Sequence, residues 1–132
     1  MEKVHVNGID VRYQVTGSGP WVTLSHSLAC RYEMWDGEIE RLSERFTVLA
    51  FDSRGHGESG APPGPYSLDM IADDVKGLFE ALGIQRSHWI GLSMGGVFGL
   101  HTALRYPGIF SSMVLADTAS ADSARGESGR TA

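Results

Sequence analysis

The segment GLSMGG, residues 91–96, decides the fold that we expect for this chain. Its first two residues end the apolar stretch 87–92, and residues 94–106 after the serine have a composition typical of a helix. A G-x-S-x-G pattern between a strand and a helix is typical of a sharp turn that exposes the serine hydroxyl. Such a turn strains the backbone of the serine and leaves no space for side chains at the flanking glycines. We therefore predict that Ser93 lies at the tip of a strand–turn–helix elbow.

Strand and helix signals alternate along the rest of the chain. Continuous apolar stretches predict buried strands at residues 21–25, 47–52 and 112–116. Apolar side chains at helical spacing predict amphipathic helices over residues 34–45 and 68–82. Alternation of this kind, with short connections rich in Gly and Pro, is typical of a mostly parallel sheet covered by helices.

Three local signals indicate where elements begin and end. Asn7-Gly8 lies between two short apolar stretches and predicts a hairpin, so the sheet should begin with an antiparallel pair. Ser67 is a candidate N-cap for the helix at 68–82, and Gly83 is expected to end that helix. The predicted class is α/β: a mostly parallel sheet with an antiparallel N-terminal hairpin and helices on both faces.

The composition limits the classes of function. With 132 residues, 42% hydrophobic and 20% charged, the chain is expected to be globular and to form one domain at most. A net charge of −5 and scattered Lys and Arg residues predict no basic surface for nucleic acid. No apolar run reaches the roughly 18 residues that span a bilayer, and the N-terminus lacks the apolar core of a signal peptide. We therefore expect a cytoplasmic protein with neither nucleic-acid nor membrane partners.

Disulfide, metal and nucleotide sites are not expected. Cys30 is the single cysteine, so it cannot form an internal disulfide, and it has no Cys or His partners at zinc-ligand spacing. A dinucleotide loop is not predicted because the G-x-G-x-x-G pattern is absent. We therefore expect no cofactor and no metal. The alternative for residues 91–96 is a plain glycine-rich turn.

The first turn of the helix after Ser93 should supply a hydrogen-bond donor to a reacting group. An attacked carbonyl develops negative charge on its oxygen, and backbone N–H groups at a helix N-terminus stabilise such a charge. The N–H of Met94 is the first expected oxyanion donor. The second should come from the loop that follows strand 21–25, where the N–H of Leu28 is our candidate.

Four residues are expected to contact a substrate. Leu28, Trp35 and Met94 should border the acyl side of the site, and packing in the core is the alternative for each. Arg31 follows the loop of Leu28 and is a candidate anchor for a substrate carboxylate. A solvated surface arginine is the alternative for Arg31.

Five segments together resemble a known family. They are SHSLACRYEMWD (25–36), FDSRGHGES (51–59), PPGPYSL (62–68), DDVKGLFEALGI (73–84) and GLSMGG (91–96). In this order they resemble the N-terminal part of the α/β-hydrolase superfamily, and they are most similar to its 3-oxoadipate enol-lactonase-like branch. The resemblance covers residues 1 to about 118.

The resemblance implies an incomplete core, with about six of eight strands. Residues 1–118 are then the N-terminal part of the core domain, and residues 119–132 are a flexible tail leading to a cap and a C-terminal part. It implies that the acid and the histidine of the catalytic triad lie in that C-terminal part. Our hypothesis is that this part is a separate or cleaved chain. Asp117 is an alternative acid, with loop capping as its other interpretation.

Three polar residues near the site are expected to be structural. The resemblance implies that Asp52 and Arg54 organise their loop through hydrogen bonds. It also implies that His26 orients the loop of Leu28, with a role as the catalytic base as the alternative.

The predicted function is hydrolysis of a small carboxylic ester or lactone through an acyl-enzyme on Ser93. Such an esterase or lactonase would need the histidine and the acid of the C-terminal part. The same serine also fits a carbon–carbon bond hydrolase or a perhydrolase. From a different class, a non-catalytic fragment or binding module that keeps the fold is the remaining alternative.

Overall fold

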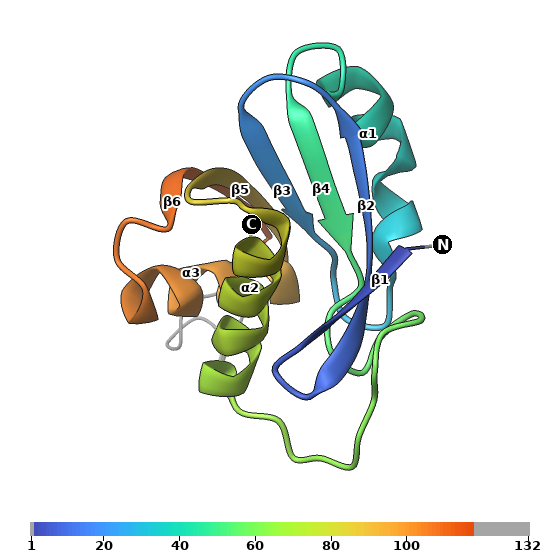
Figure 1. Cartoon of the computed structure of the whole chain (residues 1–132), viewed down its shortest axis with the longest axis vertical. Helices are drawn as coiled ribbons and strands as arrows, with labels where there is room; N and C mark the ends of the chain where they lie inside the picture. The colour runs from blue at the N-terminus through green and yellow to red at the C-terminus, as the bar shows by residue number, and fades with distance from the viewer. Residues whose placement is uncertain (1, 118–132) are drawn as a thin grey trace.

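The computed structural model describes residues 2–117 and arranges them as one six-stranded sheet with helices packed on it (Figure 1). In chain order the elements are β1 (Glu2–Val6), β2 (Ile9–Gly17), β3 (Trp21–Ser25), the 3-10 turn η1 (Tyr32–Trp35), α1 (Asp36–Leu42), β4 (Thr47–Phe51), α2 (Leu68–Leu82), β5 (Ser87–Leu92), α3 (Met94–Arg105) and β6 (Phe110–Ala116). The expected tail, residues 119–132, lies outside the described residues.

The sheet has the order β1-β2-β4-β3-β5-β6. Strands β4, β3, β5 and β6 pair in parallel, whereas β2 pairs antiparallel with both β1 and β4. The turn between β1 and β2 has a positive φ at Asn7 (49°) and at Gly8 (83°), as a type I′ hairpin requires. The predicted α/β class and its N-terminal hairpin are therefore confirmed.

Helices cover both faces of the sheet because its central strands carry apolar side chains on both sides. On one face α1 contributes to a core cluster of Val22, Leu24, Tyr32, Trp35, Ile39, Val48 and Ala50. On the other face α2 contributes to the cluster of Val6, Ile9, Val11, Leu49, Phe51, Val75, Leu78, Phe79, Ile84, Trp89 and Ile109. Helix α3 lies beside α2 on this second face (Figure 1).

The helix expected over residues 34–45 is shorter than predicted. Its first turn is the 3-10 turn η1, and α1 ends at Leu42. The N–H of Phe46 then donates to the carbonyl of Leu42 at 2.8 Å, which turns the chain into β4. The predicted apolar face is present, since Ile39 is buried, but helical spacing does not reveal where the chain must turn toward its next strand.

The longer helix α2 begins and ends as predicted. The hydroxyl of Ser67 accepts a hydrogen bond from the N–H of Met70 at 3.0 Å, which is the N-cap interaction. Gly83 adopts the left-handed conformation with φ of 74°, as a glycine after a helix often does.

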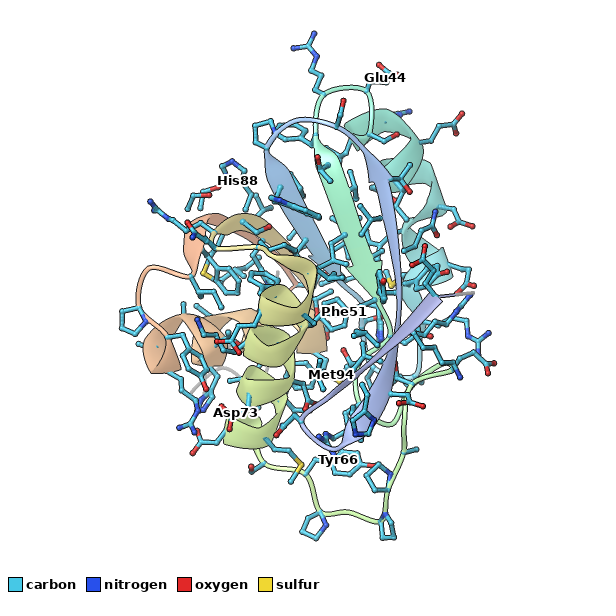
Figure 2. All side chains as sticks on the ribbon, in the orientation of Figure 1. Glu44, Phe51, Tyr66, Asp73, His88 and Met94 are labelled. Carbon is cyan, nitrogen blue, oxygen red and sulfur yellow. The ribbon has the colours of Figure 1, made fainter. Side chains whose placement is uncertain are left out.

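Three loops lie together at the end of the sheet where the parallel strands have their carboxyl ends. Residues 26–31 follow β3, residues 52–60 follow β4, and Ser93 follows β5. Loops at this end form the usual ligand site of parallel α/β sheets. Figure 2 shows Met94 at this end and His88 toward the opposite one.

Two kinds of feature are absent from residues 2–117. None of the helices formed by these residues combines the length and the apolar character needed to cross a membrane. Within the same part of the chain, no three His, Cys, Asp or Glu side chains are grouped so that they could hold a metal ion.

Candidate active site

The backbone of Ser93 has an unusual conformation between β5 and α3. Its φ is 55° and its ψ is −111°, a region that side-chain-bearing residues rarely adopt. Surrounding bonds hold it there: the N–H of Ser93 donates to the carbonyl of Ala116 at 2.8 Å, and the carbonyl of Ser93 accepts from Gly96 at 2.9 Å. The side chain of Ser93 is partly exposed and does not cap the helix. The predicted strained elbow is therefore confirmed.

The glycines on either side of Ser93 are required by close backbone contacts. A Cβ atom at Gly91 would lie 2.5 Å from the carbonyl carbon and oxygen of Gly95. A Cβ atom at Gly95 would lie 2.2 Å from the carbonyl oxygen of Ser25 on β3. Neither neighbour is a flexible side chain that could move aside, so β3, β5 and α3 meet at this point only with glycines.

Met94 is the first residue of α3, so its N–H belongs to the turn where backbone donors have no acceptor within the helix. The positive end of the helix dipole lies at the same point. The elbow therefore brings together a serine side chain and a helix N-terminus. This arrangement favours a negative charge next to the Ser93 hydroxyl.

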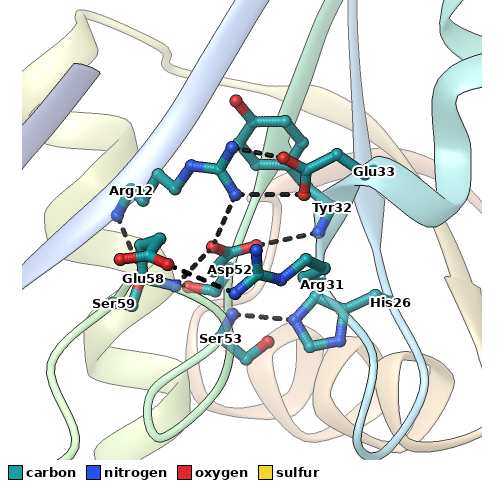
Figure 3. A network of polar contacts seen from close by, with 9 residues as sticks. All are labelled: Arg12, His26, Arg31, Tyr32, Glu33, Asp52, Ser53, Glu58 and Ser59. Atoms are coloured by element: carbon teal, nitrogen blue, oxygen red, sulfur yellow. Dashed lines mark hydrogen bonds and ion pairs between the residues drawn. The ribbon is translucent and has the colours of Figure 1, made fainter. Parts of the chain in front are cut away.

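The loop after β3 is held by His26, which is fully buried. The Nδ1 atom of His26 lies 2.8 Å from the carbonyl oxygen of Ser27, and its Nε2 atom accepts the N–H of Ser53 at 3.0 Å (Figure 3). These contacts assign the proton to Nδ1. Because both ring nitrogens are already bonded, His26 has none left to accept a proton from Ser93.

Beyond His26 the loop turns outward. The N–H of Cys30 donates to the carbonyl of Ser27 at 3.2 Å, and Ala29 has a positive φ of 63°. The side chain of Leu28 is 69% exposed at the tip of this turn. Cys30 is half-buried, and its sulfur lies 3.1 Å from the hydroxyl oxygen of Ser27.

A second anchor of the same loop is the carboxylate of Asp52, which is fully buried at the end of β4. Its Oδ1 accepts the N–H of Tyr32 at 2.8 Å. Its Oδ2 accepts the N–H of Glu58 at 2.9 Å and Nη1 of Arg12 at 3.2 Å (Figure 3). Asp52 therefore joins β2, the loop after β3 and the loop after β4.

Arg12 completes this network and was not singled out by the sequence. Its guanidinium also pairs with Glu33, and it lies 4.0 Å from the ring centre of Tyr32. The hydrogen bond with Glu33 raises the pKa of Arg12, and the same bond lowers the pKa of Glu33. Both groups are therefore charged at neutral pH.

Arg54 has the structural role that the resemblance implies. Its Nε and Nη2 atoms donate to the two carboxylate oxygens of Asp74 on α2, at 2.8 and 2.7 Å. The same Nη2 donates to the carbonyl of Asn7 in the N-terminal hairpin at 3.0 Å. Burial of both side chains makes this pair a fixed tie between the hairpin, the loop after β4 and α2.

The residues expected to contact a substrate lie in different surroundings. Met94 is partly exposed at the elbow, and Leu28 is exposed. Trp35 is 7% exposed and packs in the core beneath α1, as its alternative interpretation states. Arg31 is exposed, and its Nη2 lies 3.4 Å from a carboxylate oxygen of Glu58. Contact with a substrate stays a prediction for all four.

None of the five histidines hydrogen-bonds Ser93 within residues 2–117. Their ring nitrogens lie within hydrogen-bond distance of other groups: His5 of Asp10, His26 of Ser27 and Ser53, His56 of the Arg54 carbonyl, His88 of Ser111 and Ser112, and His101 of Asp69. Asp117 is exposed and directly follows Ala116, whose carbonyl binds the N–H of Ser93. Its role as a triad acid also stays a prediction.

The buried state of His26 predicts a loss of stability at acidic pH. Burial lowers the pKa of His26 below its ordinary value, so below about pH 6.5 the unfolded chain binds the proton more readily than the folded chain. The free energy of unfolding should therefore fall as the pH decreases below about 6.5, by at most about 1.4 kcal/mol per pH unit for this one group.

Denaturant titrations between pH 8 and pH 5 measure this effect, with His26→Asn as the comparison. The asparagine variant does not titrate and should show a shallower dependence on pH. Equal slopes for the two proteins would show that His26 does not cause the loss.

Comparison with known proteins identifies relatives of this arrangement. A family model described as alpha/beta hydrolase fold matches residues 20–128. The 3-oxoadipate enol-lactonase 2 of Acinetobacter baylyi is 36% identical over 100 residues, which cover 76% of this chain and 38% of that protein. The 2-(acetamidomethylene)succinate hydrolase of Mesorhizobium japonicum is 32% identical over 115 residues, which cover 87% of this chain and 41% of that protein.

A solved structure agrees with these matches. The crystal structure of the enol-lactonase from Burkholderia xenovorans superposes with a TM-score of 0.86 at 39% identity, over 89% of this chain and 47% of that one. The chain thus spans less than half the length of each of these relatives. The match over residues 20–128, which contains the elbow, shows that this chain belongs to the α/β-hydrolase fold family.

Proposed function

We propose that the chain is the nucleophile-bearing part of a serine hydrolase that cleaves a small carboxylic ester or lactone. The observation that carries this proposal is the strained backbone of Ser93, with φ of 55° and ψ of −111°, at the N-terminus of α3. Strain of this kind persists where the surroundings hold it, and it is concentrated at functional sites. The enol-lactonases among the relatives support an ester or lactone as the substrate class.

In the proposed reaction the Ser93 oxygen attacks the carbonyl carbon of the substrate while a histidine takes the hydroxyl proton. The carbonyl oxygen becomes negative and is stabilised by the N–H groups of Met94 and Leu28. Collapse of this intermediate breaks the ester bond, and the histidine returns the proton to the leaving oxygen. Water then attacks the acyl-enzyme by the same steps and frees Ser93.

Arg31 is the proposed anchor for a substrate that carries a carboxylate. Its ion pair with Glu58 spans 3.4 Å between side chains that are 47% and 45% exposed. Exposed pairs of this kind contribute little to stability. A substrate carboxylate can therefore replace Glu58 at little cost. Leu28 and Met94 are the proposed apolar contacts on the acyl side, and Trp35 is proposed to pack behind them from the core.

The histidine and the acid are proposed to come from a C-terminal part that packs on β6, which is one of the two edge strands of the sheet. Beside β6, on the side of α1, a groove of about 210 Å³ is lined mainly by apolar residues, including Phe46, Ile90 and Val114. Val114 is 56% exposed, and Leu104 of α3 is 80% exposed. Exposed apolar surface at a sheet edge indicates a covering element. Residues 1–118 are thus proposed as the first part of the core domain, and residues 119–132 as its connection to the remainder.

A fluorophosphonate that reacts with activated serines tests this proposal. With the C-terminal part present, the reagent should label Ser93, and Ser93→Ala should abolish labelling. The matched control is Ser18→Ala, which removes an exposed serine in the turn before β3 and should not change labelling. In the 132-residue chain alone, the reagent should label Ser93 no faster than it labels an ordinary, unactivated serine.

The possible outcomes separate a serine hydrolase from a binding module. Absence of labelling in the presence of the C-terminal part would indicate a binding module and contradict the proposed function. Rapid labelling of the 132-residue chain alone would agree with Ser93 as the nucleophile but would contradict the need for a C-terminal part.

A further inference from the structure

The side chain of Trp89 on β5 contacts the first turn of α3, two residues beyond Ser93. Trp89 is fully buried, and its indole Nε1 donates to the carbonyl of Gly95 at 3.1 Å. We propose that this hydrogen bond makes Trp89 a positioning residue, which fixes the height of the helix N-terminus above the sheet and thereby places the N–H of Met94. The inference rests on the proposed function, because it concerns the oxyanion donor of that reaction.

The contacts around Gly95 leave its peptide little freedom. Gly91 at the end of β5 lies so close that a Cβ there would meet the Gly95 carbonyl at 2.5 Å. On the other side, the carbonyl of Ser25 on β3 lies close to the Cα of Gly95. Van der Waals contacts therefore limit the approach of α3 to the sheet, and the indole of Trp89 supplies a directional bond at the same place.

The helix is adapted to receive this bond. In an α-helix the carbonyl of residue 95 accepts the N–H of residue 99, and its oxygen can accept a second donor. That donor reaches it because residue 99 is glycine: a Cβ there would lie 2.2 Å from Nε1 of Trp89. Trp89 and Gly99 therefore act as a pair, in which the glycine leaves the space that the indole occupies.

Packing keeps the indole from following movements of the helix. Its ring centre lies 4.7 Å from that of Phe110 on β6 and 6.2 Å from that of Phe51 on β4. Close-packed cores of this kind transmit displacements instead of absorbing them. The Gly95 carbonyl is thus bonded to a side chain that is fixed relative to three strands of the sheet.

The expected consequence concerns the transition state and not substrate binding. Oxyanion donors act over 2.7–3.1 Å, and removal of one costs about 10²–10³-fold in kcat. Loss of the Trp89 bond should only displace the Met94 donor, so we expect a smaller effect of about tenfold. Since a substrate carbonyl carries no full charge before attack, KM should change by less than about twofold.

The first test replaces Trp89 with phenylalanine in the hydrolase with its C-terminal part present. This variant keeps an aromatic ring but lacks the N–H. We expect kcat and the rate of phosphonate labelling to fall by the same factor, about tenfold, with KM unchanged. The matched control is Trp21→Phe, which alters a partly buried tryptophan of β3 that packs against the same core, and which should leave both rates unchanged.

A double-mutant cycle separates positioning from a general loss of packing. Gly99→Ala should push the indole away from Gly95 and lower kcat to a similar extent. In the Trp89→Phe background the same alanine should cost little more, because the smaller ring leaves space for it. Independent, multiplying effects of the two substitutions would overturn the inference.

Different results would contradict the positioning role of Trp89 and the proposed function. Folded Trp89→Phe protein that keeps its kcat and labelling rate, with only a lower melting temperature, would overturn the positioning role and leave the proposed function intact. Absence of labelling at Ser93 in the unsubstituted protein would overturn the proposed function itself.

Discussion

Replacing Ser93 with alanine is expected to lower kcat of the hydrolase by about 10⁴–10⁶-fold. The substitution removes the oxygen that forms the acyl-enzyme, so only binding and oxyanion stabilisation would contribute to the residual rate. The fold should not change, because Ser93 does not cap α3 through its side chain. Steady-state hydrolysis of a small ester or lactone measures the effect, and the melting temperature checks the fold.

The serine of the turn before β3 provides the matched control for this measurement. Ser18→Ala changes the same type of residue at an exposed position and should leave kcat unaltered. A Ser93→Ala protein that retained more than about one tenth of the original kcat would contradict an acyl-enzyme on this residue.

The second large effect concerns stability. Replacing Asp52 with alanine is expected to lower the free energy of unfolding by about 3–5 kcal/mol. The carboxylate is fully buried and accepts bonds from Arg12, Tyr32 and Glu58, so its removal leaves buried donors without an acceptor. Activity should fall as well, because the bond to Tyr32 holds one end of the loop that carries Leu28.

Glu33→Gln is the matched control, because Glu33 binds the same arginine from a more exposed position. Its side chain is 38% exposed, so water screens the pair with Arg12, and the expected loss is about 1 kcal/mol or less. Denaturant unfolding of the two variants measures both values. Similar losses of unfolding free energy for Asp52→Ala and Glu33→Gln would show that the burial of Asp52 does not increase its contribution to stability.

The elements near the elbow were predictable because local chemistry determines them. The strand before Ser93, the glycines beside it and the hairpin at Asn7 and Gly8 all follow from steric rules that act within a few residues. The same holds for Ser67, whose side chain bonds the chain only three residues away.

Interactions between distant segments were not predictable in the same way. Arg12 is buried next to Val11, although neighbouring strand residues point to opposite faces, because Tyr32 and Glu33 of η1 cover it. The alternation along β2 places Arg12 with the polar Asp10 and Gln14, so the sequence gives no signal of its burial. Nothing local identifies Asp52 and Glu33 as its partners. Likewise, the sequence predicts a strand over residues 87–92 but not the bond from the indole of Trp89 to Gly95.

The position of β6 at the edge of the sheet has a consequence for biosynthesis. A ribosome releases the N-terminal strands first, so all six strands can assemble before the proposed C-terminal part is available to cover Val114 and Leu104. During that interval the nascent protein presents an edge strand and apolar side chains to other chains. If the proposed C-terminal part covers β6, the interval before that part is synthesised is when a chaperone would protect this protein most.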